Sequence, residues 1–293
     1  MKNKLKVLVV GAAGRQGGAV ALEMLKRGHV VHAFTRNPDK KAIQSLSNQG
    51  AKIVQGDLLN KNSIEQAAED VDFIFGMTTP FESGVEAEAR QGIHLVEVAK
   101  AKGKKLVYSS VAAANQNTGI PHYESKWKVE QHIKKVLPEA TVIAPVHFME
   151  NLTTMQLQPL REGKYASALR PETKLEQLSL EDLGAFVCML FENGERLAGQ
   201  RFELASDKLS GEEAAAIVAR LTGKPIHYVQ IPLEAIRQKD AGLAMMLEWL
   251  DKHGYKVDIP ALKSKFPEIR WHTFESWIKE QNWPVLTGIA PIS

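Results

Sequence analysis

The sequence of 293 residues has little of several features that assign a protein to a special class. It contains one cysteine, Cys188, so a disulfide within the chain is excluded. No stretch approaches the roughly 18 consecutive apolar residues that a membrane-spanning helix needs. The first residues lead directly into a strand pattern, without the hydrophobic run and cleavage site of a signal peptide. These absences predict a cytoplasmic protein with no membrane association.

The chain also has no large excess of positive or negative charge. The 37 Lys and Arg residues nearly balance the 34 Asp and Glu residues, and the two signs are mixed along the chain. We therefore expect no nucleic-acid partner. The histidines are scattered and no group of His, Cys and carboxylate residues has ligand spacing, so no metal site is predicted. Cys188 lies in the apolar helical stretch 183–191, which favours a small buried hydrophobe over a reactive thiol.

What the sequence does have is a regular alternation of strand and helix patterns. Short apolar runs rich in β-branched residues lie at 5–10, 29–35, 51–55, 71–78 and 104–111, and the segments between them are long enough for helices. This order predicts an α/β fold: a doubly wound parallel sheet of the Rossmann type, with helices on both faces. One of these helices is expected to begin at a capping box formed by Asn62-Ser63-Ile64-Glu65, with Asn62 as the cap.

Beyond about residue 150 the alternation gives way to mixed elements interrupted by prolines. We expect a Rossmann domain over residues 1–150 and a smaller mixed α/β lobe over 151–293. Part of 175–205 is expected to return to the Rossmann sheet.

Glycines cluster directly after the first strand, at Gly11, Gly14 and Gly17. In a doubly wound sheet this turn faces the crevice at the carboxyl ends of the strands, and the helix N-terminus that follows offers free N–H groups to a phosphate. The turn is therefore predicted to bind the pyrophosphate of a dinucleotide. A tight turn with close helix packing would use the same glycines and is the alternative.

The end of the second strand discriminates between dinucleotides. NAD sites usually place an acidic residue there, whereas NADP sites place a cation beside the added phosphate. This chain has Arg36, whose planar guanidinium suits a phosphate, followed by Lys40 and Lys41. NADP(H) is therefore predicted over NAD(H), which is still possible, and a solvated basic loop is the alternative.

The same rule brings other strand ends to the crevice, namely Asp57, Thr78 and the pair Ser109-Ser110. Without a ligand, Asp57 would cap a turn and the hydroxyl groups would make ordinary hydrogen bonds at strand ends.

Four motifs occur in order: residues 11–17, 35–38 (Thr-Arg-Asn-Pro), 55–58 (Gln-Gly-Asp-Leu) and 148–152 (Phe-Met-Glu-Asn-Leu). With these motifs the sequence resembles the NmrA-like family, an atypical branch of the short-chain dehydrogenase/reductase superfamily. Residues 179–184 and the region of Trp277 extend the resemblance over nearly the whole chain.

The resemblance implies an NADP(H) site assembled from several strand ends. Its implied residues are Gly11, Ala12, Ala13, Gly14, Arg15 and Gln16 for the pyrophosphate, Arg36, Asn37, Lys40 and Lys41 for the 2′-phosphate, Asp57 and Leu58 for the adenine, Thr78, Thr79 and Pro80 for the nicotinamide-side ribose, Lys126 for the ribose hydroxyls, and Phe148, Met149, Glu150 and Asn151 for the nicotinamide.

The catalytic group is less clearly marked. Most members of the superfamily use Tyr-x-x-x-Lys on one helix, because residues four apart share a face and the lysine lowers the pKa of the phenol. Here His122 stands four residues before Lys126, and Tyr123 stands three before it. His122 could supply a proton, Tyr123 could rotate in, or Lys126 could act alone. The alternative without chemistry is that His122 only opens the helix after Pro121.

Two functions therefore compete. The first is an oxidoreductase that reduces a small carbonyl, quinone or enone by hydride transfer from NADP(H). The second is a non-catalytic NADP(H) redox sensor that regulates a partner protein. A sugar-nucleotide-modifying enzyme ranks third because that branch normally keeps the tyrosine. The sequence predicts neither the substrate, the partner nor the oligomeric state.

Aromatic residues are concentrated near the C-terminus, at Trp249, Tyr255, Trp271, Phe274, Trp277 and Trp283. They could line a substrate pocket, but the helical spacing of Phe274 and Trp277 favours packing in a core.

Overall fold

The computed structural model describes residues 4–281, apart from the side chains of residues 194 and 195. The chain divides into two compact units. The first comprises the residues up to Pro145 together with Leu183–Glu203. The second comprises Val146–Asp182 and the residues from Leu204 onward.

A seven-stranded sheet forms the centre of the first unit, with the strand order β10-β6-β5-β4-β1-β2-β3. The pairings from β6 to β3 are all parallel, which confirms the predicted doubly wound fold. Its strands are β1 (Lys6–Val10), β2 (Val30–Thr35), β3 (Lys52–Gln55), β4 (Phe73–Met77), β5 (Lys105–Ser109), β6 (Thr141–Pro145) and β10 (Arg201–Leu204).

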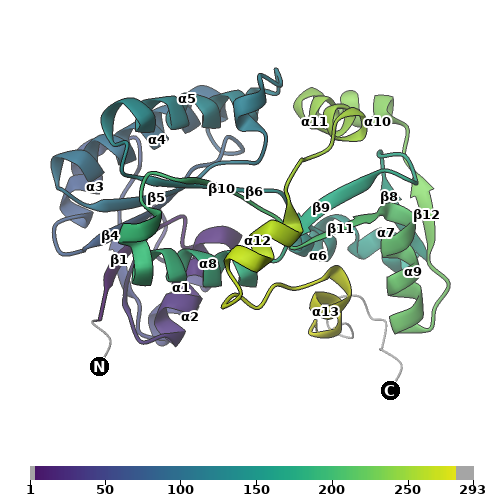
Figure 1. Ribbon diagram of the computed structural model, residues 1–293, viewed down its shortest axis with the longest axis horizontal. Coiled ribbons are helices and arrows are strands. Elements are labelled where there is room, and N and C mark those ends of the chain that lie inside the picture. The colour runs from purple at the N-terminus through teal and green to yellow at the C-terminus, as the bar shows by residue number, and fades with distance from the viewer. Residues whose placement is uncertain (1–3, 282–293) are drawn as a thin grey trace. The chain divides into compact units, whose positions relative to one another are not determined.

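Helices cover both faces of this sheet (Figure 1). One layer contains α3 (Lys61–Ala67), α4 (Gly84–Ala101) and α5 (Pro121–Val136), and the other contains α1 (Arg15–Lys26), α2 (Lys41–Asn48) and α8 (Leu180–Asn193). The central strands are apolar on both sides because both faces are covered. Val7, Leu8 and Val9 of β1 are fully buried.

Helix α3 begins earlier than the sequence predicted. The cap is Asn60, whose side chain accepts a hydrogen bond from the backbone N–H of Ser63, and the helix starts at Lys61. The prediction of Asn62 as the cap was therefore wrong. The four-residue pattern was read two positions too late because its own first residue is also an asparagine.

The second unit contains two small sheets. Strands β7 (His147–Phe148), β9 (Lys174–Leu178) and β11 (Asp207–Ser210) form the order β11-β9-β7, and β12 (His227–Gln230) pairs in parallel with β8 (Lys164–Ser167). Its helices are α6 (Leu152–Met155), α7 (Leu157–Arg161), α9 (Gly211–Thr222), α10 (Leu233–Arg237), α11 (Ala241–Lys252), α12 (Ile259–Lys265) and α13 (Phe274–Lys279).

Phe274 and Trp277 of α13 are buried in the core of this unit, together with Met149, Leu152 and Val218. This is the packing role that their helical spacing favoured. Trp283 lies outside the described residues. Among the residues described, none of the helices combines the length and apolar character needed to cross a bilayer.

Candidate functional site

The glycine turn joins β1 to α1 with a sharp reversal of the backbone. Gly11 has a φ of +69°, and the N–H of Gly14 donates to the carbonyl of Gly11 at 2.8 Å. A Cβ on Gly11 would lie 2.6 Å from Sδ of Met77, and one on Gly17 would lie 2.4 Å from the backbone of Gly11. Close packing therefore requires glycine at Gly11 and Gly17. This agrees with the alternative interpretation, a tight turn with close helix packing.

The same turn also has the properties of an anion-binding site. Helix α1 starts after Gly14, which has no side chain to cap the free N–H groups, and the first turn contains no acidic residue. Gly14 and Arg15 are exposed. The positive end of a 12-residue helix therefore faces solvent without a carboxylate of its own.

The basic residues after β2 are exposed as well. Arg36, Asn37, Lys40 and Lys41 lie on the surface. The guanidinium of Arg36 pairs with Glu82 of the segment after β4, and both side chains are about half exposed. Arg36 is thus held by a carboxylate at the surface.

Asp57 makes a local contact in the turn after β3. Its Oδ1 accepts a hydrogen bond from the N–H of Leu59 at 2.9 Å, and its own N–H donates to Ser63 Oγ. The carbonyl of Leu58 accepts a hydrogen bond from the ring of His94. Asp57 therefore caps a turn, and it is only partly buried.

Lys126 joins the carboxyl ends of β4 and β5. Its Nζ donates to the carbonyl of Thr78 at 2.7 Å and to that of Ser109 at 3.2 Å. Ser109 Oγ in turn donates to Gln16 of the glycine turn at 2.7 Å. A continuous chain of hydrogen bonds thus connects Lys126 with the residues predicted for the pyrophosphate. Thr79 and Pro80 follow Thr78 in the chain, and both are partly exposed.

A buried carboxylate neutralises this lysine. Glu88 of α4 is fully buried, and its Oε1 lies 3.2 Å from Nζ of Lys126. Ser125 donates a hydrogen bond to the other oxygen of Glu88. Burial lowers the pKa of Lys126, and the Glu88 charge opposes that shift. The lysine therefore lies in a dry site where it gives up a proton more readily than in water.

The two other candidate catalytic residues lie at the start of α5. The Tyr123 side chain is fully buried, whereas that of His122 is partly exposed. Their rings contact edge to face, with centroids 4.9 Å apart. His122 is one helical turn from Lys126, and Tyr123 points into the core.

The residues implied for the nicotinamide, Phe148–Asn151, belong to the second unit. The Oε1 of Glu150 accepts hydrogen bonds from the N–H of Leu180 at 2.9 Å and from Trp277 Nε1 at 3.1 Å. Burial raises the pKa of Glu150. Met149 is buried in the core, Phe148 is partly buried, and the Asn151 amide lies 3.3 Å from His147 Nδ1. Glu150 thus holds the β7 segment to α8 and α13.

Sequence reasoning missed Glu88. Glu88 stands in α4 between the buried residues Ala87 and Ala89. A carboxylate on a face that must be buried requires a partner, and this signal could have led to Lys126.

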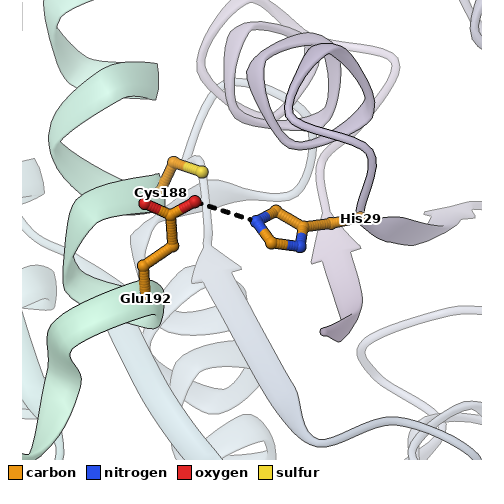
Figure 2. Close-up of side chains that lie close together, drawn as sticks. All are labelled: His29, Cys188 and Glu192. Carbon is orange, nitrogen blue, oxygen red and sulfur yellow. Dashed lines mark hydrogen bonds and ion pairs between the residues drawn. The ribbon is translucent and has the colours of Figure 1, made fainter. Parts of the chain in front are cut away.

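The first unit also brings His29, Cys188 and Glu192 together (Figure 2). The N–H of Leu5 donates to Nδ1 of His29, so Nε2 carries the ring proton and donates to Glu192 at 3.2 Å. Glu192 also pairs with Arg27 at 3.1 Å. His29, which directly precedes β2, thus contacts Glu192 of α8. Cys188 is fully buried within it.

The solved structures that share this fold include the following two. A quinone oxidoreductase from Escherichia coli, described as NADPH-dependent and complexed with NADPH, superposes with a TM-score of 0.76 at 22% identity, covering 94% of this chain and 98% of that one. The NmrA protein, a negative transcriptional regulator in complex with NADP, superposes with a TM-score of 0.77 at 20% identity, covering 96% of each chain.

Sequence comparison adds a relative of higher sequence identity. An NmrA-like family domain-containing protein from Dictyostelium discoideum is 28% identical over 269 residues, which span 85% of this chain and 88% of that protein. The sequence model of the NmrA-like family matches residues 3–278. Because that match covers nearly the whole chain, the protein belongs to the NmrA-like family.

Proposed function

We propose that this chain binds NADP(H) and is an oxidoreductase that reduces a small carbonyl, quinone or enone. The observation that carries the proposal is the chain of contacts from the glycine turn through Gln16 and Ser109 to the buried Lys126. It connects the segment suited to a pyrophosphate with a cation held at the ends of β4 and β5. The quinone oxidoreductase of similar fold supports the choice of reaction class.

The backbone and the charges of the first unit support binding of this cofactor. A Cβ at Gly11 would clash with the side chain of Met77, and one at Gly17 would clash with the backbone of Gly11. The uncapped start of α1 suits the pyrophosphate, and Arg36 suits the 2′-phosphate. When bound, NADPH supplies the hydride.

The chain itself would supply charge and a proton. Nζ of Lys126 would bind the ribose hydroxyls and stabilise negative charge that develops on the acceptor oxygen. The partly exposed ring of His122, one turn away on the same helix, is our candidate proton donor. Tyr123 is a poorer candidate because its side chain is fully buried.

Consumption of NADPH in the presence of quinones and aldehydes tests this proposal. We expect activity with at least one acceptor and its loss in Lys126→Ala. His122→Phe should reduce the rate by about a hundredfold or more, the lower range for general-acid catalysis. Lys128→Ala is the matched control, because Lys128 lies on the same helix and its exposed side chain pairs with Glu86. Failure of every acceptor would contradict the proposal.

The second candidate, an NADP(H) sensor without catalysis, is favoured by one feature. His122 replaces the tyrosine of the superfamily motif, and the neighbouring Tyr123 is buried. NmrA, whose fold is similar, is a transcriptional regulator solved with NADP. Pull-down experiments with and without NADP(H) would test this function. A set of partners that does not respond to the cofactor would exclude it.

A further inference from the structure

A group of polar side chains lies within the second unit, where α8 begins and α13 ends. Glu181 stands in the first turn of α8, His272 lies just before α13, and Glu280 follows the last residue of α13. One nitrogen of His272 and one oxygen of each glutamate all lie within 4.8 Å of one another. The sequence did not predict this group because Glu181 and His272 are far apart along the chain.

His272 is oriented by a buried carboxylate. Its Nδ1 lies 2.5 Å from Oδ1 of Asp182, and its backbone N–H donates to Oδ2 of the same residue at 3.0 Å. Both side chains are almost completely buried. A carboxylate that accepts the Nδ1 proton leaves the lone pair on Nε2, which is the arrangement commonly found behind metal-binding histidines.

The opposite nitrogen of His272 faces the two glutamates. Nε2 is buried and has no hydrogen-bond partner among the residues described. Oε2 of Glu280 lies 3.4 Å from it, and Oε2 of Glu181 lies 4.0 Å from it. Neither oxygen stands in hydrogen-bond geometry to Nε2. The hydrogen bond to Asp182 and the charges of the neighbouring carboxylates raise the pKa of His272, so a cation between the three groups would bind Nε2 in place of a proton.

The ligands are partly positioned in advance. Oε1 of Glu280 pairs with Arg270, which leaves Oε2 turned to His272. The N–H of Asp182 donates to Ser179 Oγ at 3.0 Å, and this contact fixes the residue that orients the ring. The side chain of Glu181 is 58% exposed, so it has room to move toward a bound ion.

We propose that Glu181, His272 and Glu280 bind a divalent cation of the Zn²⁺ class, with Asp182 as the positioning residue. One imidazole nitrogen and two carboxylate oxygens suit such a borderline cation, and three protein ligands leave a fourth position open. Glu181, Asp182 and Glu280 bring three carboxylates against the guanidinium of Arg270 and the imidazole of His272, so the site attracts a cation. This site goes beyond the proposed function and does not depend on it.

Metal titration of the full chain tests the proposal. After treatment with a chelator, the protein is titrated with Zn²⁺ by calorimetry and with Co²⁺ by visible absorption. We expect one Zn²⁺ per chain and the absorption bands of four-coordinate Co²⁺. Glu280→Gln and Glu181→Gln should each weaken Zn²⁺ binding at least tenfold. Glu275→Gln, in the helix that ends directly before Glu280 and paired with Lys279 and Arg220, is the matched control and should bind normally.

Two results would overturn the proposal. One is a wild-type protein that takes up no Zn²⁺ in stoichiometric amounts. The other is equal binding by Glu280→Gln and the Glu275→Gln control. Both glutamate variants leave the contact between Asp182 and His272 intact, so a failure to fold is not expected to obscure the answer. Binding of NADPH to the metal-free chain is measured separately, which keeps the outcome distinct from that of the proposed function.

Discussion

At the scale of single residues, Arg36 provides the sharpest test of cofactor choice. We expect Arg36→Ala to reduce the preference for NADPH over NADH by about 1–3 kcal/mol, the scale of a charged hydrogen bond left unmade. Calorimetric titration of both cofactors against both proteins measures the difference. Lys26→Ala, an exposed cation at the other end of α1, is the control. An unchanged preference in Arg36→Ala would mean that this residue does not read the 2′-phosphate.

The pair formed by Glu88 and Lys126 is the residue-scale test of the buried site. Breaking a buried ion pair leaves one charge without compensation, so Glu88→Gln should lower the free energy of unfolding by about 3–5 kcal/mol. The double variant Glu88→Gln/Lys126→Met removes both charges and should cost less than the sum of the single variants. Urea unfolding measures all three, and strict additivity would contradict the coupling.

The stability of the Glu88→Gln variant should also depend on pH. Burial lowers the pKa of Lys126 in the folded state below its ordinary value, and loss of Glu88 removes an influence that raises it. Between the lowered pKa and about 10.5 the unfolded chain therefore binds more protons than the folded one. Glu88→Gln should gain stability as pH rises through this window, more steeply than the wild type. Parallel stability curves for the two proteins would contradict this reading.

At the scale of elements, the contact of α1 with β1 depends on one glycine. A methyl group at Gly17 would meet the Gly11 backbone at 2.4 Å, so Gly17→Ala should destabilise the protein by about 1–3 kcal/mol and weaken NADPH binding. At the neighbouring Gly18 the nearest atom is Ala12 O at 3.4 Å. Gly18→Ala should instead stabilise the helix by about 0.5–1 kcal/mol. Thermal unfolding compares the pair, and equal effects would exclude the packing argument.

The helices and strands of the first unit differ in how well the sequence predicted them. The first five strands, β1 to β5, were predicted within one or two residues because buried parallel strands are nearly continuous apolar runs, whereas no range was predicted for β6 or β10. The cap of α3 was predicted two residues too late, because two nearby asparagines both suit a cap. Only Asn60 accepts the capping hydrogen bond from Ser63. The contact of Glu88 with Lys126 was not predicted, since it depends on how α4 packs against α5. The roles of the site residues toward a cofactor are still predictions.

At the scale of the whole molecule, the first unit is not continuous in sequence. Helix α8 and strand β10 return to it after the chain has passed through the second unit. A Cβ on Gly184 of α8 would lie 2.9 Å from the carbonyl of Ala19, which shows how closely α8 approaches α1. Arg201 of β10 pairs at 2.8 Å with Glu130, a carboxylate that is almost completely buried.

A fragment ending at Pro145 should therefore fail to fold cooperatively, because it exposes the apolar surface under α8 and leaves Glu130 without its cation. The same fragment joined by a short glycine–serine linker to Leu183–Glu203 should fold, because it restores α8 from Leu183 and β10 up to Glu203. Circular dichroism during urea unfolding compares the two fragments. A cooperative transition of the shorter fragment at the same urea concentration would mean that the sheet up to β6 is sufficient. In that case the returning segment would serve to connect the units and would not complete the core.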